Sequence, residues 1–175
     1  SHKKAMPGFI GDIGVITGAS AAALQDVLST IQRRWPMMKV HLYPSLVQGN
    51  LAPKSLIQAL LKADKNHHDA LLIVRGGGSF EDLFCFNDVE LVKTIYSLDT
   101  YIVSGVGHEV DTTLCDLVCD HRSVTPTAAA QWVSLDQYEV MIQIEKNKTL
   151  LINEMRHILN GYSSQLNIYR SEEHT

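Results

Sequence analysis

The stretch HDALLIVRGGGSFEDL, residues 68–83, contains the pattern that decides the fold. Its first half, HDALLIV (68–74), is an almost continuous apolar run, which is typical of a β-strand that is covered on both faces. The run ends at Arg75, and three glycines follow. Because strands covered on both faces belong to parallel sheets, we expect the glycine-rich segment to leave the carboxyl end of such a strand.

The same alternation of apolar runs and helical patterns continues on both sides of this stretch. Strands separated by helices of about 10–15 residues indicate βαβ units with right-handed crossovers. Residues 8–133 are therefore predicted to form an open, Rossmann-like α/β domain with a parallel sheet and helices on both faces. The other expected strands are 10–17, 38–43 and 101–106, and the expected helices are 20–35, capped by Ser20, 55–64 and 88–98.

Residues 134–175 differ in composition from the preceding residues, because they contain no proline and one glycine. Apolar residues recur there in an approximate heptad, which predicts a long helix that leaves the globular part toward a coiled coil. A terminal helix packed back on its own sheet is the alternative interpretation, and both stay open. The heptad residues are Leu151, Met155, Ile158, Tyr162, Leu166 and Tyr169.

Composition limits the classes of function. The chain has 175 residues, 45% of them apolar, and a formal net charge of −4. This balance is not that of a protein that grips many phosphates, so nucleic-acid binding would need locally gathered positive charge or another domain. No apolar run reaches the roughly 20 residues that cross a bilayer, and no signal peptide is recognisable. The odd number of cysteines, three, indicates reduced thiols in a cytoplasmic protein.

The segment after the third strand, RGGGS (75–79), has the chemistry of an anion site. Ligands of open parallel sheets bind outside the carboxyl ends of the strands. Glycines let a ligand approach the backbone, and amide groups at a helix start favour an anion. Arg75 adds a planar, permanently charged guanidinium suited to phosphate. The expected phosphate contacts are Gly76, Gly77, Gly78 and Ser79.

Two local structures are compatible with this segment. Ser79 and Asp82 have the spacing of a capping box, which would begin a helix beside the anion site. Alternatively, the segment is a tight turn in which Arg75 pairs with Glu81 or Asp82. The segment is neither a Walker loop nor a dinucleotide fingerprint.

A second polar cluster follows the fourth strand, in GVGHEVD (105–111). If a helix begins here, His108 and Asp111 lie three residues apart on one face. A histidine can exchange a proton near neutral pH and a carboxylate can orient it, although a structural hydrogen bond is the alternative. Farther along, Thr125 and Pro126 predict the start of another helix, whose amide groups could face the same crevice.

The acids and the histidine of these clusters are also candidate metal ligands. Asp26, His108, Glu109 and Asp111 offer suitable oxygen and nitrogen ligands. Their spacing alone does not settle the matter, and a nearby arginine makes a metal unnecessary for neutralising phosphate. In isolation, Asp26 has the pattern of an ordinary solvated helix residue.

Three long motifs closely resemble the large subunit of bacterial exonuclease VII: RGGGSFEDLFCFN (75–87), GVGHEVDTTLCDLVCDHR (105–122) and TPTAAA (125–130). The likeness covers about residues 7–135. It implies a nuclease specific for single-stranded DNA that cuts from both 5′ and 3′ ends, releases short oligonucleotides and requires no divalent metal. It also implies functional roles for Asp26, Arg75, His108 and Asp111, and only the resemblance singles out Asp26.

The resemblance further implies partners. The family has an N-terminal OB-type domain for single-stranded DNA, which we expect to be absent from this chain. It also assembles with several copies of a small helical subunit, for which the helix from about residue 134 is the natural docking site. Two other classes of function stay open: a non-catalytic module that binds a nucleotide or a phosphorylated ligand, and a scaffold for helical partners.

Overall fold

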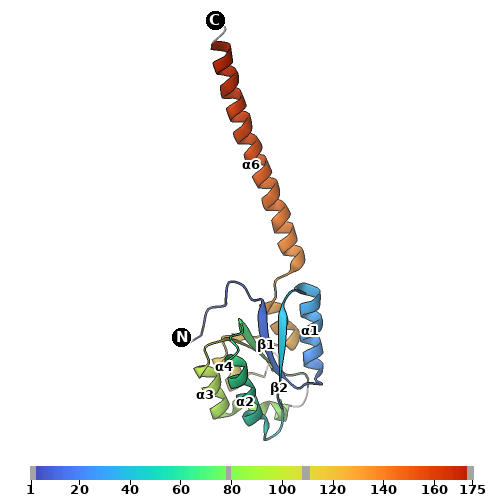
Figure 1. Ribbon diagram of the computed structural model, residues 1–175. Helices are drawn as coiled ribbons and strands as arrows, with labels where there is room; N and C mark the ends of the chain where they lie inside the picture. The colour runs from blue at the N-terminus through green and yellow to red at the C-terminus, as the bar shows by residue number, and fades with distance from the viewer. Residues whose placement is uncertain (1–2, 78–79, 108–110, 173–175) are drawn as a thin grey trace. The chain divides into compact units, whose positions relative to one another are not determined.

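The computed structural model describes residues 3–77, 80–107 and 111–172. Two compact units follow each other along the chain, Ser1–Leu135 and Asp136–Thr175. The first is built on a five-stranded sheet, and the second on one long helix (Figure 1).

The sheet is parallel throughout and has the strand order β2-β1-β3-β4-β5. Its inner strands β1, β3 and β4 are almost completely buried, because helices cover their Val, Ile and Leu side chains on both faces. The predicted fold class is therefore confirmed. The strands are β1 (Asp12–Thr17), β2 (Lys39–Pro44), β3 (Ala70–Val74), β4 (Tyr101–Gly105) and β5 (His121–Arg122).

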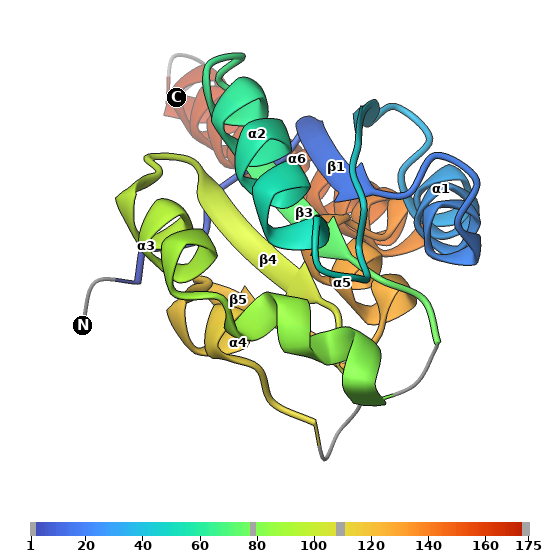
Figure 2. The same ribbon diagram turned by 90° about the horizontal axis from the view of Figure 1, so that it is seen from below.

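Helices lie on both faces of this sheet, as Figure 2 shows. On one face, α1 (Ala22–Arg34) packs against α5 (Pro126–Val133). The other face carries α2 (Ala52–Asp64), α3 (Val89–Ser97) and α4 (Leu114–Val118), together with the 3-10 helix η1 (Phe80–Asn87). In the sheet, β2 pairs with one edge of β1 and β3 pairs with the other edge. The order of the strands therefore reverses between β1 and β3, and open α/β sheets bind ligands at such a topological switch.

The start of α1 differs from the prediction. Ser20 does not cap the helix: the N-cap position is Ala21, and no side chain accepts a hydrogen bond there. Backbone hydrogen bonds close this turn instead, from Ala21 N to the Gly18 carbonyl oxygen (3.1 Å) and from Leu24 N to the Ala21 carbonyl oxygen (3.0 Å).

The helix that could have begun near residue 108 begins later, at Leu114. Thr113 and Asp116 form a reciprocal capping box, in which each side chain accepts a backbone N–H of the other residue. This box fixes the helix start, so Asp111 precedes α4. The expectation that Asp111 lies on a helix face is therefore wrong.

The fifth strand, β5, has no counterpart in the sequence prediction. It contains two polar residues, His121 and Arg122, so it gives no apolar run. It pairs with Val103 and Ser104 of β4, and the His121 ring stacks on Trp132 of α5 with centroids 3.6 Å apart. Tertiary contacts rather than local propensity therefore make this strand.

All three cysteines are free and buried, at Cys85, Cys115 and Cys119. Burial raises the pKa of Cys85 to about 11 and raises the pKa values of the other two thiols still further. Since the thiolate is the reactive species, we expect a disulfide reagent at pH 8 to modify the native protein far more slowly than the urea-unfolded protein, in which three thiols react. A thiol that reacts in the native protein as fast as free cysteine would contradict this expectation.

The second unit consists of α6 (Gln137–Glu172), a helix of 36 residues. At 1.5 Å per residue it is about 54 Å long. The apolar residues of the approximate heptad are exposed on it, and the coiled coil stays a prediction. Within the part of the chain that the structure describes, we find no helix with both the length and the apolar character of a bilayer-crossing segment.

Candidate active site

A cavity of about 230 Å³ opens at the carboxyl edge of the sheet, beside the topological switch. Its walls come from α1, the segments after β3 and β4, and the start of α5. Five predicted site residues line this one cavity: Asp26, Arg75, Gly76, Gly77 and Thr125. Val106, Gly107, Val124, Pro126 and Thr127 complete its lining.

A larger hollow of about 410 Å³ lies beside η1, and Phe84 and Asp88 are among its lining residues. None of the predicted site residues that the structure describes lines it. We assign the candidate site to the smaller cavity, because that cavity combines a guanidinium, a carboxylate and glycine backbone at the edge where parallel sheets bind ligands.

The guanidinium of Arg75 is fixed in place. Its side chain is only 3% exposed, and Nη2 donates to Oδ2 of Asp82 at 2.9 Å. Its backbone N–H donates to the Gly105 carbonyl oxygen (3.2 Å), which joins the ends of β3 and β4. The structure thus contains the Arg75–Asp82 pair of the alternative interpretation, in which the segment is a tight turn. This ion pair holds the planar cation in the cavity wall before any ligand arrives.

Two glycines at the carboxyl end of β4, the last residue of the strand and the second residue after it, allow the chain to pack closely beside the cavity. A Cβ on Gly107 would lie 2.2 Å from the carbonyl oxygen of Asp111, so only glycine fits where the chain folds back. A Cβ on Gly105 would lie 3.0 Å from both the Thr125 carbonyl oxygen and the Ala129 Cβ. The start of α5 thus rests directly on the end of β4, which brings its first turn to the cavity.

The first turn of α5 forms one wall of the cavity. Thr125 is its N-cap, as predicted, and Oγ1 accepts a hydrogen bond from Ala128 N at 3.0 Å. Pro126 occupies the first turn and has no N–H to offer. The amide of Thr127 is therefore the first backbone donor of this helix at the cavity. Sequence reasoning missed Thr127, although its place after a Thr-Pro pair was a usable signal.

The carboxylate of Asp116 anchors the loop that leads away from the cavity. It is buried, and it accepts hydrogen bonds from Ser104 Oγ (2.6 Å), Thr113 Oγ1 (2.8 Å) and Thr113 N (2.9 Å). The Nε atom of Arg122 lies 3.9 Å away. Sequence analysis overlooked this carboxylate, although the Thr-x-x-Asp spacing was the available signal.

Not every predicted residue enters this cavity. Asp26, which is exposed on α1, does line it. Asp111 is half-buried behind Gly107 and is not among the lining residues. His108, Glu109, Gly78 and Ser79 lie outside the described residues. Within residues 3–77, 80–107 and 111–172, Asp26 and Asp111 belong to no group of three potential metal ligands.

An open parallel sheet with a charged, glycine-lined cavity at its carboxyl edge is the arrangement of α/β proteins whose ligand site lies at a topological switch. Within that class, the chain belongs to the exonuclease VII large-subunit family: residues 1–174 match the family described as "Exonuclease VII, large subunit".

Three relatives, each named exodeoxyribonuclease 7 large subunit, support this membership. The Lactobacillus acidophilus protein is 40% identical over 168 residues, which cover 95% of this chain and 37% of the relative. The Campylobacter jejuni subsp. doylei protein is 42% identical over 165 residues, covering 94% and 43%. The Shewanella loihica protein is 46% identical over 156 residues, covering 89% and 35%. The chain therefore spans less than half the length of the relatives that it matches.

Proposed function

We propose that this chain carries the catalytic site of an exodeoxyribonuclease that hydrolyses single-stranded DNA from its 5′ and 3′ ends to short oligonucleotides. The observation that carries the proposal is the meeting of Asp26, Arg75 and the glycine backbone in one cavity. Membership of the exonuclease VII large-subunit family supplies the reaction class.

In the proposed mechanism, the cavity holds one scissile phosphate. Arg75 and the amides of Gly76, Gly77 and Thr127 bind its oxygens and stabilise the negative charge that develops in the transition state. Thr125 supports this wall as the cap of α5. The RGGGS pattern predicts that Gly78 and Ser79 contribute to the same phosphate site, and the resemblance implies a functional role for His108, to which we assign proton transfer.

The two acids act on water and on the histidine. Asp26 lines the same cavity as Arg75, and its carboxylate can position the attacking water there. Asp111 orients His108, which acts as general acid or base. Because Arg75 supplies the charge that stabilises the phosphate, the proposed reaction has no obligatory divalent metal.

The cavity recognises a phosphate rather than a whole strand. Among the described residues, its lining contains one cation and one carboxylate, and the chain carries a formal net charge of −4. We therefore place the grip on the DNA strand in the N-terminal OB-type domain of the longer protein. The exposed apolar residues of α6 are the proposed docking surface for the small subunit. The buried free thiols agree with a cytoplasmic location.

Exchange of Asp26 for asparagine tests the site. Asp26→Asn is expected to lower hydrolysis of single-stranded DNA by about 100-fold or more, because an amide cannot accept a proton from water. The assay uses the longer protein with its small subunit, in the presence of EDTA. Asp99→Asn is the matched control: it makes the same change at an exposed carboxylate before β4, at the opposite edge of the sheet.

Two results would contradict the proposal. Unchanged activity of a folded Asp26→Asn protein would remove this carboxylate from the reaction. Loss of all digestion in EDTA, with recovery on adding Mg²⁺, would show that the site works through a metal. Tight binding of a nucleotide without release of products would instead favour the non-catalytic phosphate-binding module.

A further inference from the structure

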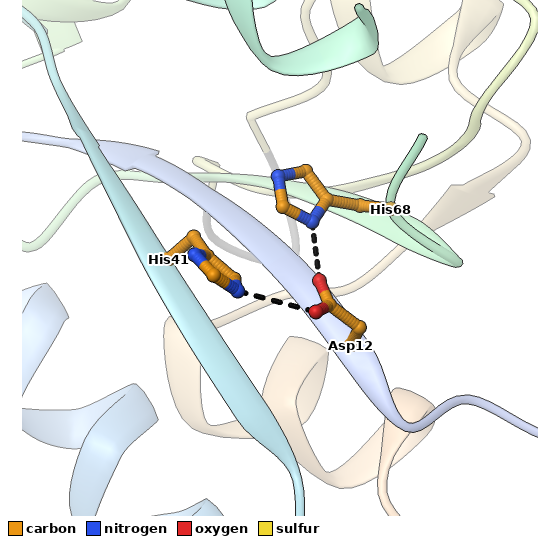
Figure 3. A group of neighbouring side chains, drawn as sticks. All are labelled: Asp12, His41 and His68. Carbon is orange, nitrogen blue, oxygen red and sulfur yellow. Dashed lines mark hydrogen bonds and ion pairs between the residues drawn. The ribbon is translucent and has the colours of Figure 1, made fainter. Parts of the chain in front are cut away.

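A second polar cluster lies at the amino edge of the sheet, away from the cavity. Asp12 begins β1, His41 lies on β2, and His68 lies two residues before the start of β3. Their potential ligand atoms all lie within 4.8 Å of one another. As Figure 3 shows, the His68 Nδ1 atom is hydrogen-bonded to one carboxylate oxygen of Asp12, and the His41 Nε2 atom lies 3.1 Å from the other.

Strand register and a glycine create this cluster. The parallel pairing sets Gly14 beside His41, and Asp12 projects from the same face of β1 as Gly14 because side chains alternate along a strand. A Cβ on Gly14 would lie 3.0 Å from His68 Cδ2 and 3.1 Å from Tyr43 Cε2. Because Gly14 has no side chain, the rings of His68 and Tyr43 can occupy the space beside it.

Surrounding groups orient the cluster. The side chain of His68 is only 4% exposed, and its Nε2 atom lies 2.7 Å from the Tyr43 hydroxyl, which accepts a hydrogen bond from Asn66 Nδ2 at 2.6 Å. Asp69 Oδ2 accepts the backbone N–H of Asp12 at 2.9 Å. Histidines that ligate metals typically have their second ring nitrogen held by such a partner.

We propose that Asp12, His41 and His68 bind one divalent transition-metal ion of the Zn²⁺ type. Two imidazoles and a carboxylate suit Zn²⁺, and water would fill the fourth position. Ligands about 2.1 Å from a tetrahedral ion are about 3.4 Å apart. The half-exposed His41 side chain can supply the small closing movement and also leaves an entry path from solvent.

Metal binding also requires a proton to change place. In the metal-free state the His68 Nδ1–H donates to Asp12, which leaves Nε2 to accept from the Tyr43 hydroxyl. When Nδ1 ligates the ion, the single ring proton of the neutral imidazole is on Nε2. This N–H then donates a hydrogen bond to the Tyr43 oxygen. Tyr43 is thus a positioning residue that serves both states.

The proposed ion is structural rather than catalytic. The strand β1 runs for six residues between this cluster and the cavity, a distance of roughly 17 Å. The ion would fasten the amino ends of β1, β2 and β3, including the edge strand β2. This inference does not depend on the proposed nuclease function.

Titration of the chelator-treated protein with Zn²⁺ tests the site, with stoichiometry and affinity measured by calorimetry. One ion per chain is expected, with a higher melting temperature in excess Zn²⁺. His41→Gln and Asp12→Asn should each weaken binding at least about tenfold, and Tyr43→Phe should weaken it by about 10- to 100-fold. His67→Asn is the matched control, since His67 is exposed, adjoins the cluster and has a positive φ of 53° that asparagine tolerates.

Circular dichroism establishes that each variant is folded, and the half-exposed His41 makes His41→Gln the variant best able to retain the fold. Co²⁺ provides a second readout, because tetrahedral binding through nitrogen and oxygen gives visible absorption that Zn²⁺ should displace. Absence of saturable Zn²⁺ binding to the unsubstituted protein would overturn the proposal. Undiminished affinity in folded His41→Gln would overturn it equally.

Discussion

Replacement of Arg75 with lysine is expected to reduce the hydrolysis of single-stranded DNA by about 100- to 1000-fold. Lysine keeps the positive charge, so Asp82 retains an ionic partner, but it lacks the planar fork of donors. A single ammonium cannot match the guanidinium geometry toward both Asp82 and a phosphate. The loss should fall mainly on kcat, since the proposed contact strengthens as charge develops on the phosphate.

Two controls separate chemistry from folding in this experiment. Arg33→Lys makes the same exchange at an exposed residue in the last turn of α1 and should leave activity unchanged. Thermal unfolding of Arg75→Lys shows whether the buried site tolerates lysine. A folded Arg75→Lys protein with full kcat would refute the assigned role of the guanidinium.

Removal of the Asp116 carboxylate is expected to have the largest effect on stability. Asp116→Ala leaves the Ser104 hydroxyl and the Thr113 amide without their buried acceptor, and Arg122 without the nearby charge. A buried group that loses its partner costs about 1–3 kcal/mol, and more than one such group loses its acceptor here. We expect urea denaturation to show a loss of about 3 kcal/mol or more.

The control for this change is Glu90→Ala, at an exposed carboxylate of α3 that pairs with Lys93. Exposed pairs of this kind contribute little, so the free energy of unfolding should change by less than about 1 kcal/mol. A loss below about 1 kcal/mol for Asp116→Ala would mean that water replaces the carboxylate in its network. Where stability is lost, DNA hydrolysis should also fall, because Asp116 anchors the segment behind Gly107.

The sheet was largely predictable because buried parallel strands have a strong pattern. The runs at β1, β3 and β4 are mostly apolar, and each has a glycine at or within two residues of its carboxyl end, so sequence alone located them. β5 was not predictable, since its two polar residues become a strand only through pairing with β4 and stacking of His121 on Trp132. Helix starts depended on competition between caps, and Thr113 with Asp116 outweighed the earlier polar residues.

The candidate site was predictable to a smaller degree. Glycines and polar residues at successive strand ends located the cavity, because carboxyl ends of parallel strands share one edge. Asp26 gave no local signal: an exposed acid in a helix has the same pattern whether or not it faces a ligand. The Asp12, His41 and His68 cluster was missed entirely, since its members lie on three strands and meet only through register.

The position of β1 inside the sheet affects how the chain emerges from a ribosome. Ile13 pairs with Val40 on one side and with Ala70 on the other. Synthesis at about 5–20 residues per second therefore leaves one edge of this hydrophobic strand unpaired for a few seconds after β2 has formed. A chain whose translation halts before β3 would contain a two-stranded intermediate with an unpaired hydrophobic edge, which is prone to aggregation. Chaperone capture of nascent chains should therefore peak between the synthesis of β2 and that of β3.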